Sequence, residues 1–410
     1  MKKNIFFISS YFYPERGAGA VRAFEFVKTW SKKYNIDVFT NVPNYPFGRP
    51  YKGYRLKFPK ATDTDSFKFT VHRVFTLLAE NSGFLKRSIA YIIFCLSTFL
   101  NILFYKKKPT LVIATSPQLL TSLSGVLTAK YYKVPFILDV RDLWPEAIIE
   151  SGVAINKYII RILKSLSAFA YKSAKIISVT TEVQKKKIVA SYNVPSEKIK
   201  VIANGYNAEM FKPINSDDKK ILEFKKLFGK NHISVGYIGN LAFYYDFDVF
   251  LSLAKDFKDI NFVLMGEGSQ KNDLEYKINQ AKLNNLKLLD SIDYEDVPYA
   301  MNALDMGIVK HKDNMPITES MLPVKLFEYI ACNTPCIYYG KGEGAALMKE
   351  LNLNDLILNF EQGYEMLKSK IQSYNFKNDI AFNKETLKCY AREALALNFQ
   401  NNIIDKVIVP

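Results

Sequence analysis

Two side chains near the start of one predicted helix are suited to binding a phosphorylated ligand. Lys325 and Glu328 occur in LPVKLFEYIACNTPCIYYGKGEGAALMKE, residues 322–350. Pro323 favours a helix start just before them, and their spacing of three places both side chains on one helix face. An ammonium group and free helix N–H groups can bind a diphosphate, and a carboxylate one turn on can accept two ribose hydroxyls. The same spacing also fits an ordinary i, i+3 ion pair on a helix surface.

Short β-branched or aromatic runs alternate with helical lengths along the whole chain. In the first half these runs are NIFFISSYF, IDVFT, FKFTVHRVF, TLVIATS, PFILDV and KIISVT, and after Asn204-Gly205 they are ISVGYIGN, INFVLMGEG, LKLLDSI, MGIVKH and PCIYYG. Such alternation is typical of parallel, doubly wound sheets. We predict an α/β protein with two Rossmann-like domains, residues 1–205 and 206–384, facing a cleft at the carboxyl ends of both sheets. We expect the final helical region, residues 385–410, to pack back on the first domain.

The composition limits the chemistry that the chain can perform. A length of 410 residues suggests two domains of about 200 residues each. With only three histidines, a multi-histidine metal site is not expected. Cys332 and Cys336 have a C-x3-C spacing without a second ligand pair, so we interpret them as reduced core residues. Asp63-Thr64-Asp65 has the spacing of a metal–diphosphate motif, but it lies in a polar loop before a predicted strand, so no metal site is predicted.

Positive charge is concentrated in the first half of the chain. Residues 1–205 contain 32 Lys and Arg against 12 Asp and Glu, a net charge of +20, whereas the remainder contains 24 against 28, a net charge of −4. A basic half can face nucleic acid, anionic lipid headgroups or a phosphorylated substrate, or it can be a lysine-rich solvated surface. No recognised nucleic-acid-binding module accompanies the charge, so nucleic acid is not an expected partner.

One segment is apolar enough to raise the question of a membrane. KRSIAYIIFCLSTFLNILFYKKK, residues 86–108, has no charge from Ser88 to Tyr105 and has basic residues at both ends. Predicted strands of one sheet precede and follow it, so a transmembrane crossing would separate strands that must pair. We expect a crossover helix, either buried or lying in the membrane interface, and the basic flanks favour the interface. The expected membrane-contacting residues are Lys86, Arg87, Ile92, Ile93, Phe99, Lys106 and Lys107.

Several motifs carry a resemblance to a known family. PVKLFEYIACNTPCI resembles the donor-binding motif of retaining family 4 glycosyltransferases, and ISVGYIGNL, INFVLMGEGSQKNDLE, LKLLDSIDYEDVPYAMNALDMGIV and VIANGYNAEMF occur in that family's order. YFYPERGAGAVRAFEF, NVPNYPFGRPYKGY and DVRDLWPEAIIESG resemble bacterial enzymes that build O-antigen, capsule or colanic-acid units, most closely those of the fucosamine-transferase type. The likeness covers nearly the whole chain and implies the GT-B fold.

The resemblance also implies a set of site residues. By position, Glu328 matches the family's ribose-binding glutamate, and Lys325 would approach the donor phosphates. Asp142 would orient the acceptor hydroxyl, although it fits equally well as a cap of the following helix. The implied catalytic residues are Asp142, Lys325 and Glu328, and the implied donor-binding residues are Gly17, Gly19, Arg22, Gly239, Asn240, Gly266, Gly268, Lys325, Glu328 and Glu343.

Two positions depart from the family pattern. Glu319 lies nine residues before Glu328, one more than the family's E-x7-E spacing allows. The Arg and Lys pair that usually follows the GNL turn is replaced by AFYYDFD. These departures affect the catalytic assignments more than the expectation of nucleotide-sugar binding.

The resemblance implies a retaining, metal-independent glycosyltransferase of surface polysaccharide biosynthesis that needs no cofactor. It would move a sugar, expected to be an N-acetylated amino sugar, from a UDP-sugar to a polyprenyl-diphosphate-linked saccharide. The start MKKNIFFISSYFYPERG predicts a strand rather than a signal peptide. We therefore expect a cytoplasmic protein, peripheral on the inner face of the cytoplasmic membrane and in contact with an anionic surface. Two alternatives stay open: a UDP-sugar 2-epimerase, and a non-catalytic nucleotide-sugar-binding partner protein.

Overall fold

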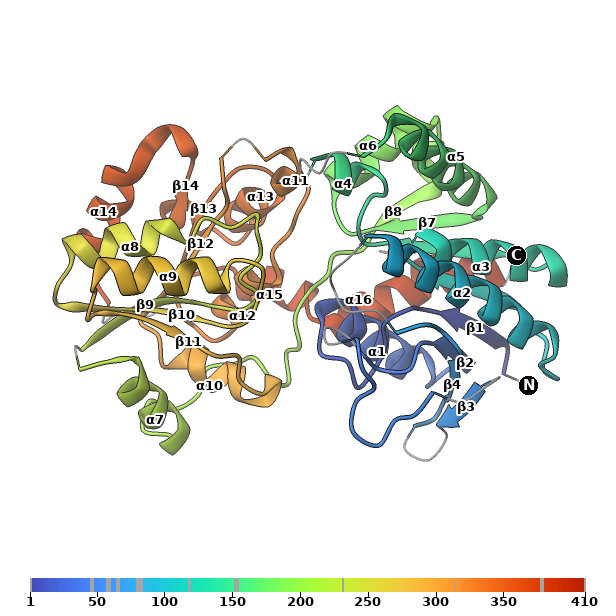
Figure 1. The fold of residues 1–410 in the computed structure, drawn as a ribbon, viewed down its shortest axis with the longest axis horizontal. Coiled ribbons are helices and arrows are strands. Elements are labelled where there is room, and N and C mark those ends of the chain that lie inside the picture. The colour runs from blue at the N-terminus through green and yellow to red at the C-terminus, as the bar shows by residue number, and fades with distance from the viewer. Residues whose placement is uncertain are drawn as a thin grey trace. The chain divides into compact units, whose positions relative to one another are not determined.

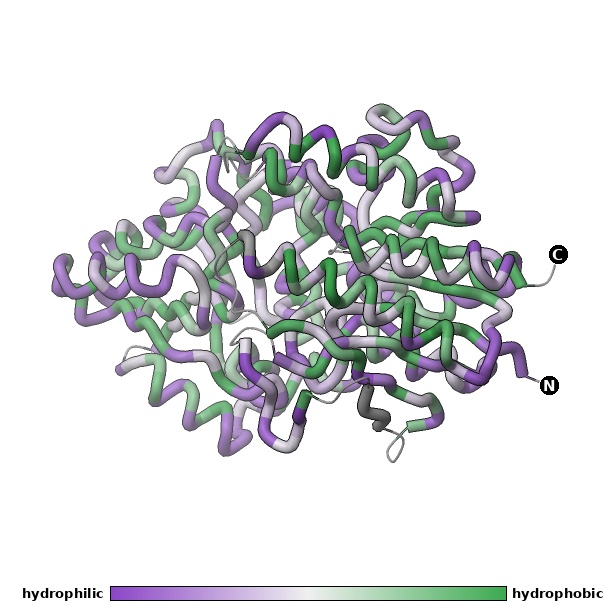
Figure 2. The backbone as a smooth tube through the Cα atoms, turned by 45° about the vertical axis from the view of Figure 1, so that its right-hand side comes forward, coloured by the Kyte–Doolittle hydropathy of each residue, from purple (hydrophilic) through white to green (hydrophobic). Residues whose placement is uncertain are grey.

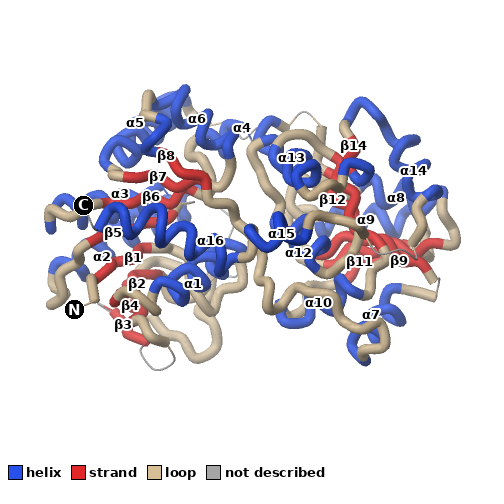
Figure 3. Tube along the Cα trace, turned by 180° about the vertical axis from the view of Figure 1, so that it is seen from behind, coloured by secondary structure: helices blue, strands red, loops and turns tan. Residues whose placement is uncertain are grey.

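The computed structural model describes residues 2–44, 48–56, 60–63, 67–78, 84–116, 119–150, 155–230, 232–313, 315–376 and 380–408. The chain forms two compact units. The first comprises Met1–Asn204 together with Arg392–Pro410, and the second comprises Gly205–Ala391. In each unit a sheet lies between helices, as the labels of Figure 1 and the colours of Figure 3 show.

The described part of the first unit contains an eight-stranded sheet in the order β3-β4-β2-β1-β5-β6-β7-β8. Its neighbouring strands are parallel except β3 and β4, which are antiparallel. β3 occupies part of a segment expected to be a polar loop, whose Thr64 and Asp65 lie outside the described residues. The strands are β1 Asn4–Ile8, β2 Asn35–Thr40, β3 Lys60–Asp63, β4 Thr70–Val74, β5 Leu111–Thr115, β6 Phe136–Val140, β7 Ile176–Val179 and β8 Ile199–Val201.

Helices connect the parallel strands of the first unit, because a parallel pairing needs a crossover. They are α1 Ala18–Trp30, α2 Phe84–Leu103, α3 Leu119–Tyr132, α4 Glu146–Glu150, α5 Lys157–Ser173 and α6 Glu182–Tyr192. The C-terminal segment adds α16 Arg392–Phe399, the π-helix Gln400–Ile404 and α17 Asp405–Ile408. It packs on α1, where the Trp30 indole N–H donates to the Ala396 carbonyl at 2.8 Å and the Trp30 ring lies 4.9 Å from that of Phe399.

The second unit has a six-stranded parallel sheet in its described part, in the order β11-β10-β9-β12-β13-β14. The strands are β9 Ile233–Ile238, β10 Ile260–Met265, β11 Leu286–Leu289, β12 Met306–Lys310, β13 Cys336–Tyr339 and β14 Ile357–Leu358. The helices are α7 Lys219–Phe228, α8 Asp248–Asp256, α9 Lys271–Ala281, α10 Val297–Asn302, α11 Pro316–Glu319, α12 Val324–Ala331, α13 Glu343–Glu350, α14 Gly363–Ser373 and α15 Lys384–Cys389.

These two sheets confirm the predicted α/β class with doubly wound parallel sheets. In each sheet the strand order reverses next to the first strand of the unit. The reversal lies between β1 and β5 in the first unit and between β9 and β12 in the second. The central strands are buried, as expected for strands whose two faces are both covered by helices. Ligands of such sheets bind beyond the carboxyl ends of the strands at these switch points.

Helix α2 carries apolar side chains on its solvent side as well as on its inner side. Thr98 and Ile102 face inward and are fully buried, whereas Ile92, Leu96 and Leu100 are 48%, 54% and 52% exposed. The buried Thr98 hydroxyl has no hydrogen-bond partner among the described residues, whereas other polar side chains of this region are bonded within the unit. The Ser97 hydroxyl donates to the Phe75 carbonyl, Asn101 Nδ2 to the Ser97 carbonyl and Thr76 Oγ1 to the Ala90 carbonyl. The solvent side is therefore apolar like the inner side, where Phe94 and Ile102 are fully buried, and the hydrophobic colour of Figure 2 runs along much of this helix.

The end of α2 is attached to the sheet by a buried carboxylate. Asp37 of β2 accepts hydrogen bonds from Tyr105 at 2.6 Å and from Lys107 at 3.3 Å, and it lies 3.0 Å from His72 Nε2. Burial raises the pKa of Asp37, but the bonds from His72 and Tyr105 and the Lys107 charge outweigh it and leave the pKa below its usual value. Among the described residues, no helix combines the length and the apolarity that a membrane crossing requires.

Candidate functional site

The turns that follow β9 and β10 touch through glycines. Gly239 and Gly266 have φ values of 153° and 149°, a region that side chains rarely occupy. A Cβ at Gly266 would overlap the Gly239 carbonyl oxygen, and a Cβ at Gly268 would overlap the Leu241 carbonyl. The Tyr237 hydroxyl donates to the Asn240 carbonyl at 3.0 Å and holds the first turn in place. Gly239, Asn240, Gly266 and Gly268 thus form one compact pair of turns at the carboxyl edge of the sheet.

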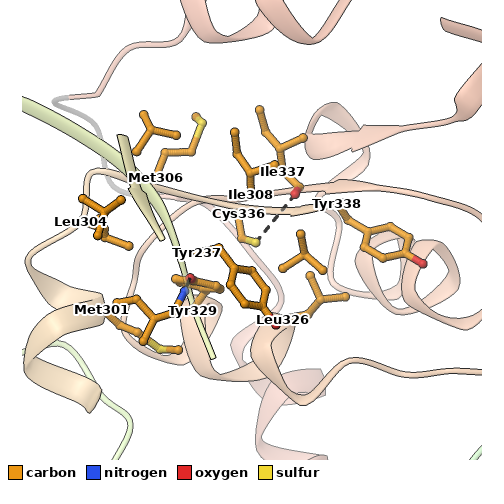
Figure 4. Packing of buried hydrophobic residues seen from close by; sticks show 14 of the residues in the cluster. Tyr237, Met301, Leu304, Met306, Ile308, Leu326, Tyr329, Cys336, Ile337 and Tyr338 are labelled. Atoms are coloured by element: carbon orange, nitrogen blue, oxygen red, sulfur yellow. Dashed lines mark hydrogen bonds between the residues drawn. The ribbon is translucent and has the colours of Figure 1, made fainter. Parts of the chain in front are cut away.

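Helix α12 is fixed against the end of β9. The Tyr329 hydroxyl accepts a hydrogen bond of 2.8 Å from the Ile238 amide, one residue before the Gly239 turn. Figure 4 shows Tyr329 and Leu326 of α12 packed with Tyr237 of β9 and Ile308 of β12. This docking places the start of α12, and with it Lys325, beside the turn. A Cβ at Gly239 would lie 2.6 Å from Lys325 Cε.

Lys325 and Glu328 form an ion pair that is largely withdrawn from solvent. The Lys325 ammonium donates to Glu328 Oε2 at 2.8 Å. The Glu328 side chain is 3% exposed and that of Lys325 is 21% exposed. The i, i+3 pair predicted from the spacing is present, but its carboxylate is buried rather than on the surface. A buried, oriented carboxylate beside a glycine turn can accept hydroxyl groups of a ligand with little loss of side-chain entropy.

The start of α13 lies against the chain that precedes α12. Gly342 has φ 76°, and a Cβ there would overlap the backbone of Glu319. Glu343, the first residue of α13, therefore follows a turn in contact with Glu319. Glu319 is thereby placed next to the Gly342 turn, although it stands one position outside the family spacing.

An aromatic cluster occupies the position after β9 where the family has an Arg and Lys pair. Phe243 is 37% exposed, and the buried Tyr245 ring stacks on the His311 ring at 5.1 Å. His311 follows β12, is fully buried, and has its Nδ1 3.3 Å from the Tyr338 hydroxyl. Burial lowers the pKa of His311 to about 4, so the ring is neutral at physiological pH. Lys310, which precedes His311, is paired with Asp246.

In the first unit, a glycine turn and an arginine come together after β1 and β6. Gly17 precedes α1, and no side-chain cap bonds the first amides of the helix. A Cβ at Gly19 would overlap the Arg141 guanidinium, which therefore lies directly against the backbone of the turn. Asp142 is exposed beside Arg141, and its carbonyl accepts from the Ser116 hydroxyl at 3.2 Å. Sequence reasoning missed Arg141, although it lies in the RDLWPE motif immediately before the predicted Asp142.

Arg22 has an internal role in the same unit. The side chain is 1% exposed, and its guanidinium donates to the Ala203 and Ile202 carbonyls and pairs with Asp139 at 3.3 Å. These bonds join α1 to the carboxyl ends of β6 and β8. The residue expected to bind the donor is thus occupied with packing contacts in this structure, whereas Gly17, Gly19 and Asp142 lie at the carboxyl edge of the sheet.

The expected membrane-contacting residues are distributed along α2 and its flank. Lys86 and Lys106 are exposed, as is Ile92, whereas Ile93 and Phe99 are half-buried. Lys107 is directed partly to Asp37, and the side chain of Arg87 lies outside the described residues. Leu96 and Leu100, which the prediction omitted, are more exposed than Ile93 and Phe99.

Two α/β units with doubly wound sheets and polar groups at their carboxyl edges have the architecture of the GT-B fold, which the structural neighbours share. Residues 218–375 match the family described as Glycosyl transferases group 1. Across 99% of both chains, the fold is similar to sucrose-phosphate synthase from Thermosynechococcus elongatus, with a TM-score of 0.75 and 13% identity. It is also similar to Anabaena HepE in complex with UDP-glucose, with a TM-score of 0.62 and 16% identity over 99% of this chain and 95% of that chain.

Two curated relatives match parts of the sequence. TuaH of Bacillus subtilis, whose name proposes a glycosyltransferase of teichuronic acid biosynthesis, is 24% identical over 52% of both chains. An uncharacterized glycosyltransferase, MJ1059 of Methanocaldococcus jannaschii, is 26% identical over 61% of both chains. The chain thus spans about half of the length of the first relative and about three fifths of the second.

Proposed function

We propose that the chain is a glycosyltransferase whose second unit binds a nucleotide diphosphate sugar. The observation that carries this proposal is the meeting of the Gly239 turn, the Lys325 ammonium and the buried Glu328 carboxylate at the end of β9. Turn amides and an ammonium suit a diphosphate, and a buried carboxylate suits ribose hydroxyls. The family matched by residues 218–375 supports the reaction class, and the UDP-glucose complex of the HepE neighbour supports a UDP-sugar as donor.

Lys325 can serve the donor without leaving Glu328. An ammonium group has three N–H donors, and the bond to Glu328 uses one of them. The remaining donors are available to phosphate oxygens near the Gly239 turn. The second Glu328 oxygen can accept from the ribose, so the same ion pair orients both ends of a nucleoside diphosphate. This chain has aromatic residues after β9 where the family has an Arg and Lys pair. Lys325 therefore supplies more of the stabilisation of the diphosphate charge here.

We propose transfer with retention of the anomeric configuration and without metal. In such a reaction the leaving diphosphate accepts the proton of the acceptor hydroxyl on the same face, so stabilisation of its charge matters more than a nucleophile. Asp142, exposed beside Arg141 and the Gly19 turn, is the proposed residue that orients the acceptor hydroxyl. Comparing the anomeric configuration of donor and product by NMR tests retention directly.

The proposed acceptor is a polyprenyl-diphosphate-linked saccharide of a surface polysaccharide, and the proposed sugar is an N-acetylated amino sugar. The name of the TuaH relative supports a polysaccharide pathway. The exposed apolar side of α2 supports a lipid-bound acceptor, because the protein then works at the membrane surface where that acceptor lies. We place the protein at the inner face of the cytoplasmic membrane on this basis.

Incubation with labelled UDP-sugars and a membrane lipid extract tests the function. Transfer of label to a lipid-extractable saccharide supports the proposal. Conversion of the donor to its C2 epimer would indicate a 2-epimerase, and binding of an unchanged donor would indicate a non-catalytic partner protein. Asp142→Asn is the matched variant, because it should retain donor binding while losing transfer.

A further inference from the structure

A lysine-rimmed groove lies where α3 and α5 end. Its volume is about 360 Å³. The floor is apolar, and the rim carries three ammonium groups and one hydroxyl. The lining residues are Val126, Ala129, Lys130, Lys133, Val134, Pro135, Phe136, Ser173, Ala174 and Lys175. This groove lies next to the strand starts of β6 and β7, at the edge of the sheet opposite to Gly19 and Asp142.

The charge around this groove is uncompensated. Residues 81–138 contain seven Lys and Arg, residues 151–181 contain five, and neither segment contains an Asp or Glu. None of the ion pairs found among the described residues involves the three rim lysines. Helix α9 shows the usual arrangement, with Lys277 paired to Asp273 one turn away. The groove therefore presents an anion-binding rim over an apolar floor.

Exposed apolar side chains lie around the groove on the outer faces of three adjacent helices, α2, α3 and α5. We call these three outer faces the helix platform. The Phe99 ring of α2 lies 6.3 Å from that of Tyr131 on α3. The ammonium of Lys130, also on α3, lies 4.4 Å over the Phe169 ring of α5. The outer residues of the platform are Ile89, Ile92, Leu96, Leu100, Leu127, Tyr131, Tyr158, Ile159, Ile162 and Phe169, all 39% exposed or more.

Helix α5 also has an exposed apolar face, as α2 does. Tyr158, Ile162 and Phe169 fall on one outer face at helical spacing, and Arg161 and Lys164 lie beside them, also exposed. An apolar stripe with basic flanks and without acidic residues is typical of helices that lie in the headgroup region of a bilayer. Sequence analysis identified this pattern only in residues 86–108, so α5 extends the apolar surface beyond the predicted segment.

We propose that the groove binds the phosphate headgroup of an anionic phospholipid while the helix platform rests on the bilayer. The rim lysines match the headgroup charge, and the apolar floor can hold the glycerol and first acyl carbons. A second copy of this chain is a poor occupant, because two surfaces without acidic residues would repel each other. The inference does not depend on sugar transfer, so it can fail or hold independently of the proposed function.

Binding to vesicles with and without anionic lipid tests the inference. The protein should sediment with mixed phosphatidylcholine and phosphatidylglycerol vesicles far more than with phosphatidylcholine alone. Replacing Lys130, Lys133 and Lys175 with Gln should reduce this binding about 100-fold, because each lysine near an anionic surface contributes about 1 kcal/mol. Restoring the charges as Lys130→Arg, Lys133→Arg and Lys175→Arg should recover most of it.

A control with equal charge loss distinguishes a headgroup site from diffuse attraction. Lys157→Gln, Arg161→Gln and Lys164→Gln remove three charges from the same platform outside the groove. The groove variant should bind at least about tenfold more weakly than this control. Equal losses in the two variants would overturn the groove as a site. Lys219→Gln, Lys226→Gln and Lys230→Gln, on exposed positions of the second unit, should keep wild-type binding.

Calorimetry with soluble ligands identifies what the groove recognises. Short-chain phosphatidylglycerol below its micellar concentration should bind with a stoichiometry of one, and far more tightly than inorganic phosphate, which lacks the carbons that the apolar floor would hold. Equal affinity for inorganic phosphate, or binding of a DNA oligonucleotide without binding of vesicles, would contradict a lipid site. If the three lysines serve only to stabilise the negative dipole ends of α3 and α5, the groove variant should have a lower Tm but retain vesicle binding. That result would overturn the proposal.

Discussion

At the scale of single residues, the sequence spacing of Lys325 and Glu328 predicts their contact but not their burial. The i, i+3 spacing correctly indicated that the two side chains meet. It gave no information on burial, because burial of Glu328 depends on α12 being fixed to β9 through Tyr329. Arg141 was missed for a related reason. Its contact with Gly19 joins residues far apart in the chain, and the motif around it suggested the neighbouring Asp142 instead.

Glu328→Gln should weaken donor binding while the fold is kept. A carboxylate forms charge-assisted bonds to hydroxyls that an amide replaces only in part, at a cost of roughly 1.5–3 kcal/mol. The affinity for UDP should therefore fall about 10- to 100-fold. Calorimetry with UDP measures this, and the loss should be the same for the complete UDP-sugar, because both contain the ribose. Wild-type affinity for UDP in this variant would remove Glu328 from the donor site.

Lys325→Met serves as the contrasting variant. It should weaken UDP strongly and leave uridine binding nearly unchanged, because the ammonium is assigned to the diphosphate. It should also reduce thermal stability more than Glu328→Gln does, since it leaves a buried carboxylate without its partner. Equal loss for uridine and UDP would contradict the assignment of Lys325 to the phosphates.

His311 should make the second unit sensitive to acid. Its pKa is lowered to about 4 by burial, whereas an unfolded chain has a histidine pKa of about 6.5. Between these values the unfolded chain binds a proton that the folded chain does not, so stability falls as the pH decreases. The loss should reach about 3 kcal/mol near pH 4. Urea unfolding followed by circular dichroism should show a weaker pH dependence in His311→Gln, and identical dependence would contradict this role.

At the scale of elements, the strands were predictable and the orientation of α2 was not. Continuous apolar runs such as NIFFI and INFVLM identify the buried parallel strands, because both their faces are covered. The short edge strands β3, β8 and β14 lack such a run. For α2, the sequence predicted a crossover helix, buried or in the membrane interface, with Ile92, Ile93 and Phe99 among its membrane-contacting residues. In the structure Leu96 and Leu100 are more exposed than Ile93 and Phe99.

This orientation determines which residues of α2 should affect membrane binding. Ile92→Ser, Leu96→Ser and Leu100→Ser should move the protein from the membrane to the supernatant fraction, because each of these side chains is about half exposed. Activity on a water-soluble acceptor analogue should remain, and added salt should release part of the wild type. Fractionation of cell lysate measures this.

Phe94→Ser is the matched control within α2. Phe94 is fully buried, so its replacement should cost about 3–5 kcal/mol of stability. If the outer triple variant is as destabilised as Phe94→Ser, α2 is an ordinary core helix and its outer face has no membrane role.

At the scale of the whole molecule, the positive charge and the family match lie in different halves of the chain. All of the excess positive charge lies in residues 1–205, because the remainder is net negative, whereas the family match covers residues 218–375. Two series of strands separated near Gly205 were enough to predict two doubly wound sheets. We expected residues 385–410 to pack back on the first domain, but the pattern could not identify Trp30 as the contact, because this packing joins opposite ends of the sequence.

Transfer should not require a divalent metal. Among the described residues, no group of three His, Cys, Asp or Glu side chains is placed to hold a metal ion. In our proposal Lys325 and the turn amides stabilise the leaving diphosphate, so EDTA should leave the rate largely unchanged. Loss of turnover in EDTA with recovery in Mn²⁺ would show that a metal performs the role assigned to Lys325.

The packing of α16 on α1 has a consequence for biosynthesis. A ribosome makes residues 392–408 only after it has synthesised the whole second unit, so α1 lacks its C-terminal neighbours until the end of synthesis. Until then Trp30, which is 1% exposed in the finished protein, has no Phe399 ring beside it and no Ala396 carbonyl for its indole N–H. During that interval a nascent chain displays a large apolar side chain of the kind that chaperones retain. Completion of the first unit is therefore tied to the release of the chain, and in a Trp144→Phe variant the fluorescence of Trp30 reports the moment at which it happens.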